Sequence, residues 1–263
     1  MFRTFWSAER SRKERFRPGI LAAAAVLAIA AGSSGTEAQA TDAGTTDQGW
    51  KFMVAPYIWG PSLDGTVVVK GLEAEADISA SDIFHHTDIA GMALFAARKG
   101  NWGIVGDAVW DELSVESDAP PADIEPTLGI ITVQGLRRLG RCADLTFGAR
   151  YNYLKTKLDF EPPIGVAVEK SRDWIDPIVG VVLRTPEGHR WHATLVADIG
   201  GFGVGSELTW QIAPTAGFDM AKWASLEFGY RVLSTDYETG DGSDRFEYDI
   251  VYQGPLLGVA FRF

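Results

Sequence analysis

Apolar and polar residues alternate with a period of two along most of the chain beyond residue 40. In residues 224–232, for example, apolar side chains take the even positions and polar or small ones the odd positions. No stretch in this part keeps an apolar period of 3.6 residues over three turns, as an amphipathic helix requires. Because such alternation between Gly, Pro, Asn and Asp residues is typical of strands, the sequence predicts an all-β protein.

The alternating segments predict an antiparallel up-and-down barrel of about ten strands, with eight or twelve as alternatives. The predicted wall strands are 50–59, 88–98, 102–116, 127–139, 144–160, 172–185, 190–200, 207–220, 224–237 and 246–263. The inward faces of 88–98 and 127–139 stay open, because both segments carry apolar residues on either side. An even count returns both ends of the wall to the same side.

Alternation alone does not tell which face points inward, since a soluble sandwich or lipocalin-type barrel alternates as well. The connections are more informative. Short turns are expected at 99–101, 139–142, 186–189 and 221–222, and long polar loops at 117–126, 160–172 and 236–245. Short periplasmic turns that alternate with longer outer loops are typical of a transmembrane β-barrel.

Tryptophan positions indicate two membrane interfaces, because indole rings favour the headgroup level. One set opens strands just after short turns or the N-terminal lead, and the other lies near the opposite strand ends. The first set is Trp50, Trp102, Trp191 and Trp223, and the second is Trp59, Trp110, Trp174 and Trp210. The chain ends in an alternating strand at Phe263, which resembles the signal read by the outer-membrane barrel assembly machinery.

Three segments resemble a widespread family of uncharacterised, porin-like outer-membrane β-barrel proteins of proteobacteria. They are residues 57–66 (YIWGPSLDGT), 200–210 (GGFGVGSELTW) and 254–263 (GPLLGVAFRF). The resemblance covers most of residues 50–263. It implies the fold and an outer-membrane location in a Gram-negative bacterium, and it carries no established activity.

The N-terminus has the order of a secretory signal peptide, which we expect to span residues 1–40. A basic segment precedes an apolar run at 19–31, and the small residues of Ala38-Gln39-Ala40 suit cleavage after Ala40. The run is too short to span a membrane as a helix. Without an Arg-Arg pair or a nearby cysteine, export by the general secretory (Sec) route is expected. Residues 41–49 would form a short periplasmic lead and 50–263 the barrel.

Composition adds two exclusions. With 46% hydrophobic and 22% charged residues among 263, the chain is a folded protein. Its net charge of -11 argues against a nucleic-acid partner. The single cysteine, Cys142, allows no internal disulfide and no multi-cysteine metal site.

The sequence predicts no catalytic, cofactor-binding or metal-binding residues. The glycine run 200–205 precedes a strand, whereas a phosphate-binding loop precedes a helix, so a flexible outer loop is expected. His85 and His86 are adjacent and would point apart, and His189 lies in a predicted turn. His192 has no serine placed beside it by a motif, which favours a hydrogen-bonded interior histidine over a hydrolase residue.

Ionisable residues share the parity that we assign to the lumen. They are Asp107, Asp111, Arg150, Asp176, Arg184, His192, Asp198, Asp219, Glu227, Arg231 and Arg262. A charge that faces lipid is unfavourable, so this segregation is what a bilayer requires. Inside a narrow lumen these side chains either pair and close it or line a thin aqueous path.

Residues 60–87 break the pattern. They contain a candidate hairpin at 66–79 and a candidate helical turn at 81–86, which together form either a surface hairpin or a plug in the lumen. A hairpin that joins the wall would raise the strand count to twelve.

The favoured function is passive: a narrow channel for small solutes or a structural protein of the envelope. The alternatives are an enzyme that modifies lipid or lipopolysaccharide, and a soluble periplasmic ligand-binding barrel. The expected partners are outer-membrane lipid, the barrel assembly machinery and a small solute. We expect a monomer that needs no cofactor.

Overall fold

A computed structural model describes residues 49–69, 72–80, 87–113, 115–118, 121–160, 167–186 and 188–263. The predicted signal peptide, most of the periplasmic lead and the candidate helical turn at 81–86 lie outside the described residues. Among the described residues, no helix is long and apolar enough to cross a membrane.

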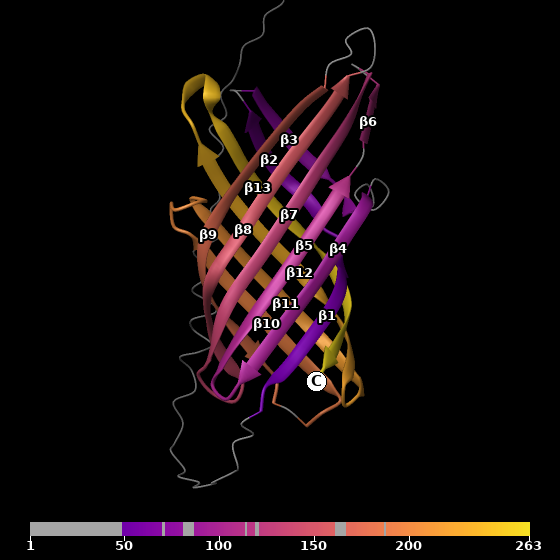
Figure 1. Cartoon of the computed structure of the whole chain (residues 1–263), viewed down its shortest axis with the longest axis vertical. Helices are drawn as coiled ribbons and strands as arrows, with labels where there is room; N and C mark the ends of the chain where they lie inside the picture. The colour runs from indigo at the N-terminus through magenta and orange to yellow at the C-terminus, as the bar shows by residue number, and fades with distance from the viewer. Residues whose placement is uncertain are drawn as a thin grey trace, which may run out of the picture. The chain divides into compact units, whose positions relative to one another are not determined.

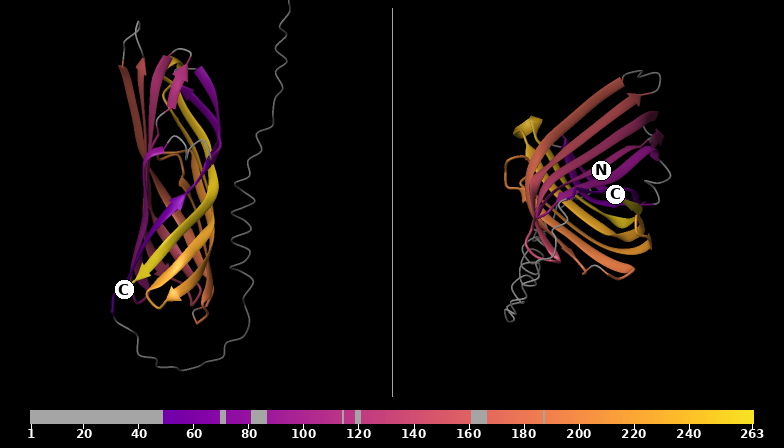
Figure 2. Two further views of the ribbon diagram at one scale, coloured as in Figure 1. Left: turned by 90° about the vertical axis from the view of Figure 1, so that its right-hand side faces the viewer. Right: turned by 60° about the horizontal axis from the view of Figure 1, so that its bottom comes forward.

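Ten antiparallel strands form a closed barrel, which confirms the predicted fold (Figure 1). The wall strands are β1 (Lys51–Trp59), β4 (Thr87–Lys99), β5 (Trp102–Leu113), β7 (Pro121–Arg138), β8 (Ala143–Phe160), β9 (Ala167–Arg184), β10 (Trp191–Gly201), β11 (Leu208–Ala221), β12 (Ala224–Thr239) and β13 (Phe246–Arg262). The last strand pairs with the first, from Met53 opposite Arg262 to Trp59 opposite Leu256. Figure 2 shows the C-terminal end of β13 beside β1.

The described part of residues 60–87 extends the sheet outside the closed ring. A hairpin of β2 (Ser62–Val69) and β3 (Leu72–Ile78) pairs with the first half of β13, and β1 pairs with the second half. The ring therefore keeps ten strands. A short β6 (Val115–Asp118) pairs with β7, and a 3₁₀ turn, η1 (Gly242–Asp244), lies between β12 and β13.

The two ends of the barrel differ in their connections. At the short-turn end, β4 to β5, β7 to β8, β9 to β10 and β11 to β12 are joined by tight turns. This end also holds Phe263, whose backbone exchanges hydrogen bonds with Phe52. At the other end, the long-loop end, β7 and β9 begin before their predicted limits and extend into the expected loops 117–126 and 160–172, so much of that loop sequence is sheet.

The outward face of the wall is apolar. Exposed outward side chains include Phe52, Val54, Ile58, Phe95, Ile104, Ile131, Val133, Phe147, Ile175, Val179, Phe228 and Leu257. Between the levels of Trp102 and Trp110, no Asp, Glu, Lys, Arg or His of the described wall strands takes an outward position. The structure also settles the two ambiguous strands, since Phe95 faces outward on β4 and Ile131 and Val133 do so on β7.

The first tryptophan set lies exposed at the short-turn end, but the second set is divided. Trp110 is 38% exposed and Trp210 lies on the outward face, whereas Trp59 and Trp174 are only 2% and 6% exposed. The prediction of an interfacial position is wrong for these two residues. Both occupy inward positions, and Trp59 follows Ile58, which is 60% exposed.

Candidate functional site in the barrel interior

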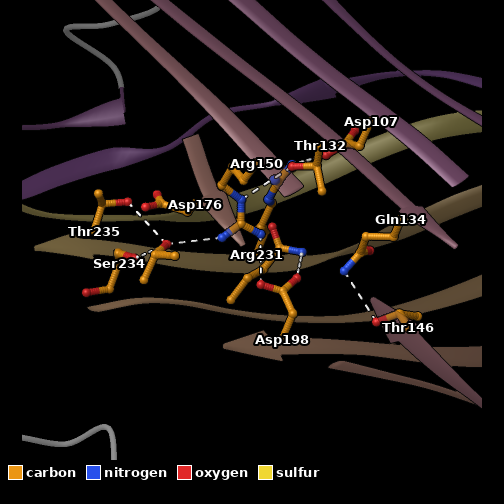
Figure 3. Close-up of polar contacts among 12 residues, drawn as sticks. Asp107, Thr132, Gln134, Thr146, Arg150, Asp176, Asp198, Arg231, Ser234 and Thr235 are labelled. Atoms are coloured by element: carbon orange, nitrogen blue, oxygen red, sulfur yellow. Dashed lines mark hydrogen bonds and ion pairs between the residues drawn. The ribbon is translucent and has the colours of Figure 1, made fainter. Parts of the chain in front are cut away.

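A buried ion pair inside the barrel joins β8 to β10, two wall strands that lie on either side of β9 (Figure 3). Arg150 of β8 places Nη2 2.8 Å from Oδ1 of Asp198 on β10, with both side chains essentially inaccessible. Arg150 also donates to the hydroxyls of Thr132 and Thr209 at 3.3 and 3.1 Å, and Gln211 donates to Asp198 at 3.3 Å. Paired and hydrogen-bonded in this way, two charges are tolerated away from water.

Arg231 of β12 forms a second buried pair in the interior. Its Nη1 lies 2.9 Å from Oδ2 of Asp107 and donates to the Tyr57 hydroxyl at 3.1 Å. Tyr57 in turn donates to Asp107 at 2.6 Å, and the guanidinium lies 4.7 Å from the ring centroid of Trp59. The Nε and Nη2 atoms of Arg231 are buried and have no hydrogen-bond partner among the described residues.

Asp176 of β9 is a fully buried carboxylate that accepts several hydrogen bonds. Its oxygens accept from the backbone N–H of Ser206 at 2.6 Å and from the Ser206 hydroxyl at 2.9 Å. The amide of Asn152 and the indole N–H of Trp174 donate to it at 2.9 and 3.1 Å. Asp176 therefore fixes the β10–β11 connection to the neighbouring strands.

The glycine run 200–205 ends β10 and enters a compact turn that is anchored on Asp176 through Ser206. Gly203 donates to the Ser206 carbonyl at 3.0 Å, and Phe202 adopts a positive φ of 52°. A Cβ added at Gly205 would lie 2.6 Å from Oδ1 of Asp176, so the approach of this backbone to the carboxylate requires glycine. The run serves local packing and is followed by β11, not by a helix.

At the short-turn end, Asp144 bridges two arginines inside the barrel. Arg98 of β4 binds it through both terminal nitrogens, and Arg184 of β9 binds the same carboxylate. Asp144 is completely buried, while the arginines remain partly accessible. The Asp144 carboxylate therefore pairs with both guanidinium groups at this level of the interior.

His192 belongs to a separate polar group near the same end. Its Nε2 lies 2.9 Å from Oε1 of Glu227, and the Ser225 hydroxyl donates to that same oxygen. Arg262 donates to Asp219 at 2.8 Å and to Ser225 at 2.9 Å. The carboxylate thus stands between serine and histidine, whereas a hydrolase places histidine between serine and the acid. The order of groups therefore differs from that of a Ser-His-acid triad.

Aromatic and aliphatic side chains fill the interior toward the long-loop end. The buried cluster consists of Trp59, Val109, Ile130, Trp174, Leu233, Tyr248, Ile250 and Tyr252. Trp174 stacks on Tyr237 with 4.2 Å between ring centroids, and the hydroxyls of Tyr248 and Tyr252 are hydrogen-bonded. The interior therefore has two levels, a polar network and this aromatic cluster.

The structure places the predicted lumen residues on inward faces but does not gather them into one site. They divide among the separate groups described above, and Asp111 lies buried on β5, on the same inward parity as Asp107. Among the described residues, no three His, Cys, Asp or Glu side chains are arranged to hold a metal ion.

The sequence missed several members of the network. Asp144 is the second residue of β8, and Arg98 is the next-to-last residue of β4, whose inward face the sequence left open. The uncharged partners were also missed, namely Tyr57, Thr132, Asn152, Thr209, Ser225 and Gln211. Asn152, Thr209, Gln211 and Ser225 share their parity with a predicted charge on the same strand, so extending the rule to neutral polar residues finds them. Tyr57 and Thr132 lie on strands without a predicted charge, so the rule does not find them.

No family model matches the chain, and no curated protein matches it. Several solved structures are similar. The attachment invasion locus protein Ail of Yersinia pestis has 12% identity and a TM-score of 0.38, with 82% of this chain and 99% of that chain covered. The translocator domain of autotransporter NalP from Neisseria meningitidis has 11% identity and a TM-score of 0.42, with 93% and 96% covered. A Pseudomonas aeruginosa FadL homologue has 7% identity and a TM-score of 0.37, with 82% and 90% covered. Similarity at this level assigns no activity or ligand to this chain.

Proposed function

We propose that the chain is an integral outer-membrane β-barrel of a Gram-negative envelope, exported by the Sec route, with a closed interior and a structural role. The observation that carries the proposal is the segregation of the wall, which is apolar outside and charged inside. A soluble ligand-binding barrel requires the reverse, because water would meet a continuous apolar band around the molecule. Lipid suits that band, and a bilayer disfavours outward charges.

The packing of the interior supports closure. The Arg150–Asp198 pair is inaccessible, Arg231 is 4% exposed, and the aromatic cluster lies beyond them toward the long-loop end. Two successive filled levels favour a barrel that conducts no steady current. We further expect a monomer in contact with outer-membrane lipid and assembled through its C-terminal strand.

A narrow channel for small solutes is the second candidate, and one observation favours it. Nε and Nη2 of Arg231, Oε1 of Gln211 and Nε1 of Trp59 are buried polar atoms without a partner among the described residues. Such atoms in a native protein are commonly satisfied by internal water. Water held there would provide part of an aqueous path through the polar level.

Enzymatic modification of lipid has less support. The serine nearest to His192 in its hydrogen-bonded group is Ser225, and Glu227 lies between them. Among the described residues, no serine is hydrogen-bonded directly to this histidine. We therefore expect replacement of Ser225 to affect stability and not to abolish a hydrolytic activity.

Two measurements test the proposal. Membrane fractionation with boiled and unboiled samples on a detergent gel is expected to show a heat-modifiable band in the outer-membrane fraction. A soluble, unshifted band would overturn the membrane assignment. Planar bilayer recording of the purified protein is then expected to show no discrete conductance steps, whereas reproducible steps would favour the channel over the closed barrel.

A further inference from the structure

Basic side chains surround the short-turn end of the barrel. The basic ring, as we define it, consists of Lys51, Lys99, Arg137, Arg141, Arg190 and Lys222. All are exposed except Arg137, which is partly buried. Arg137, Arg141, Arg190 and Lys222 form no ion pair with a described residue, so their charges are available at the surface.

Each exposed tryptophan at this end has a cation of the ring beside it. Trp50 precedes Lys51, Arg190 precedes Trp191, and Lys222 precedes Trp223. Trp102 lies opposite Lys99 on β4 and opposite Arg137 on β7. A cation therefore lies next to an exposed tryptophan, in sequence or in strand register, at four places around one rim.

Two of these arginines are held against aromatic rings. The Arg137 guanidinium lies 4.6 Å from the ring centroid of Trp102. That of Arg190 lies 4.9 Å from Phe218, whose ring packs against Trp191 at 5.0 Å. Stacking of this kind fixes the plane of a guanidinium and leaves the N–H groups at its edge free to donate.

Among the described residues of the same end, three acidic side chains are directed away from the ring. Asp144, Asp219 and Glu227 all bind arginine or histidine inside the barrel. At the long-loop end, by contrast, acidic side chains contact the tryptophan and the lysines. There, the indole N–H of Trp110 donates to Glu112 at 3.0 Å, and the lysines of β8 pair with glutamates.

We infer that the basic ring binds the phosphate groups of anionic phospholipids in the leaflet that borders the short-turn end. The inference rests on the proposed membrane location. Indole rings place this rim at the headgroup level, and the neighbouring cations then meet phosphate oxygens there. The stacked arginines donate in a fork that matches two phosphate oxygens.

The test uses the full mature chain in nanodiscs of an equimolar mixture of phosphatidylcholine and phosphatidylglycerol. Electron paramagnetic resonance of spin-labelled lipids measures the association of each lipid with the protein. Wild-type protein is expected to enrich phosphatidylglycerol about fivefold over phosphatidylcholine, with the preference falling as salt rises. The combined variant R137Q, R141Q, R190Q and K222Q, which keeps Lys51 and Lys99, is expected to lose most of this preference.

A matched control neutralises the same number of cations at the long-loop end, in the variant K155Q, K157Q, K170Q and R172Q. It is expected to keep the wild-type preference. An equal loss in this control, or no preference in wild-type protein, would overturn the inference. Heat modifiability is measured for every sample. A heat-modifiable wild-type barrel without lipid preference contradicts the basic ring alone, whereas a wild-type chain that neither inserts nor shifts contradicts the proposed function.

Discussion

Side chains fill both levels of the barrel interior, but the two levels use different kinds of side chain. The polar level holds Arg150 and Asp198 in a network of hydroxyl and amide groups, and the aromatic level packs Trp174 against Tyr237. Both are formed by inward side chains of wall strands. The polar level depends on pairing, because a lone charge there has no water, while the aromatic level depends on shape. Their responses to substitution should therefore differ.

The largest effect is expected when the central ion pair loses one partner. Asp198→Ala leaves the buried Arg150 guanidinium without its carboxylate, which should lower the free energy of unfolding by about 3–5 kcal/mol. Urea unfolding of the protein in lipid vesicles measures this change in the free energy of unfolding. Adding Arg150→Met should recover much of the loss, because the uncompensated charge is then removed. A loss below about 1 kcal/mol for the single variant would contradict the account of the polar level.

A smaller effect is expected when a charge is placed on the opposite face at the same height. Ile131 is 42% exposed and lies next to Thr132, which points into the network. Ile131→Arg puts a guanidinium against the acyl chains and should reduce stability in vesicles by about 2–4 kcal/mol. Ile131→Leu is the control and should change little. A neutral result for the arginine variant would indicate that this face does not meet lipid.

The smallest effect is expected in the aromatic level. Trp174→Phe keeps a ring against Tyr237 but removes the indole N–H that donates to Ser206 at 2.8 Å. The buried hydroxyl and the Asp176 carboxylate then lose a donor, for a loss of about 1–3 kcal/mol in the same unfolding assay. Trp210→Phe on the outward face is the control. Equal effects of the two variants would show that the hydrogen bond contributes nothing.

The wall strands and the direction of their charges were predictable, because alternation depends only on local sequence. All ten predicted wall segments correspond to wall strands. The number of wall strands, ten and not eight or twelve, was harder to predict. The break at Gly60 and Pro61 ends β1 and lets β2 replace it beside β13, with Gly60 donating to the Pro255 carbonyl at 3.0 Å. Proline lacks the N–H that would continue the ladder.

The contacts across the interior were not predictable from alternation. Arg231 meets Tyr57 and Asp107, which are far from it in sequence and on other strands. Parity tells which face a side chain takes, but not which distant strand it meets. The errors at Trp59 and Trp174 have the same origin, since their heights near strand ends matched an interface while their parity pointed inward.

Lipid contact of the outward face is the central claim, and spin-label accessibility measures it most directly. In a Cys142→Ser background, single labels are placed at Phe147→Cys and Val179→Cys on the apolar face, and at Asp173→Cys at the long-loop end. In reconstituted vesicles, labels at 147 and 179 should be relaxed by oxygen and shielded from a water-soluble nickel chelate, while the label at 173 should favour the chelate. Equal access of the chelate to all three positions would contradict the account.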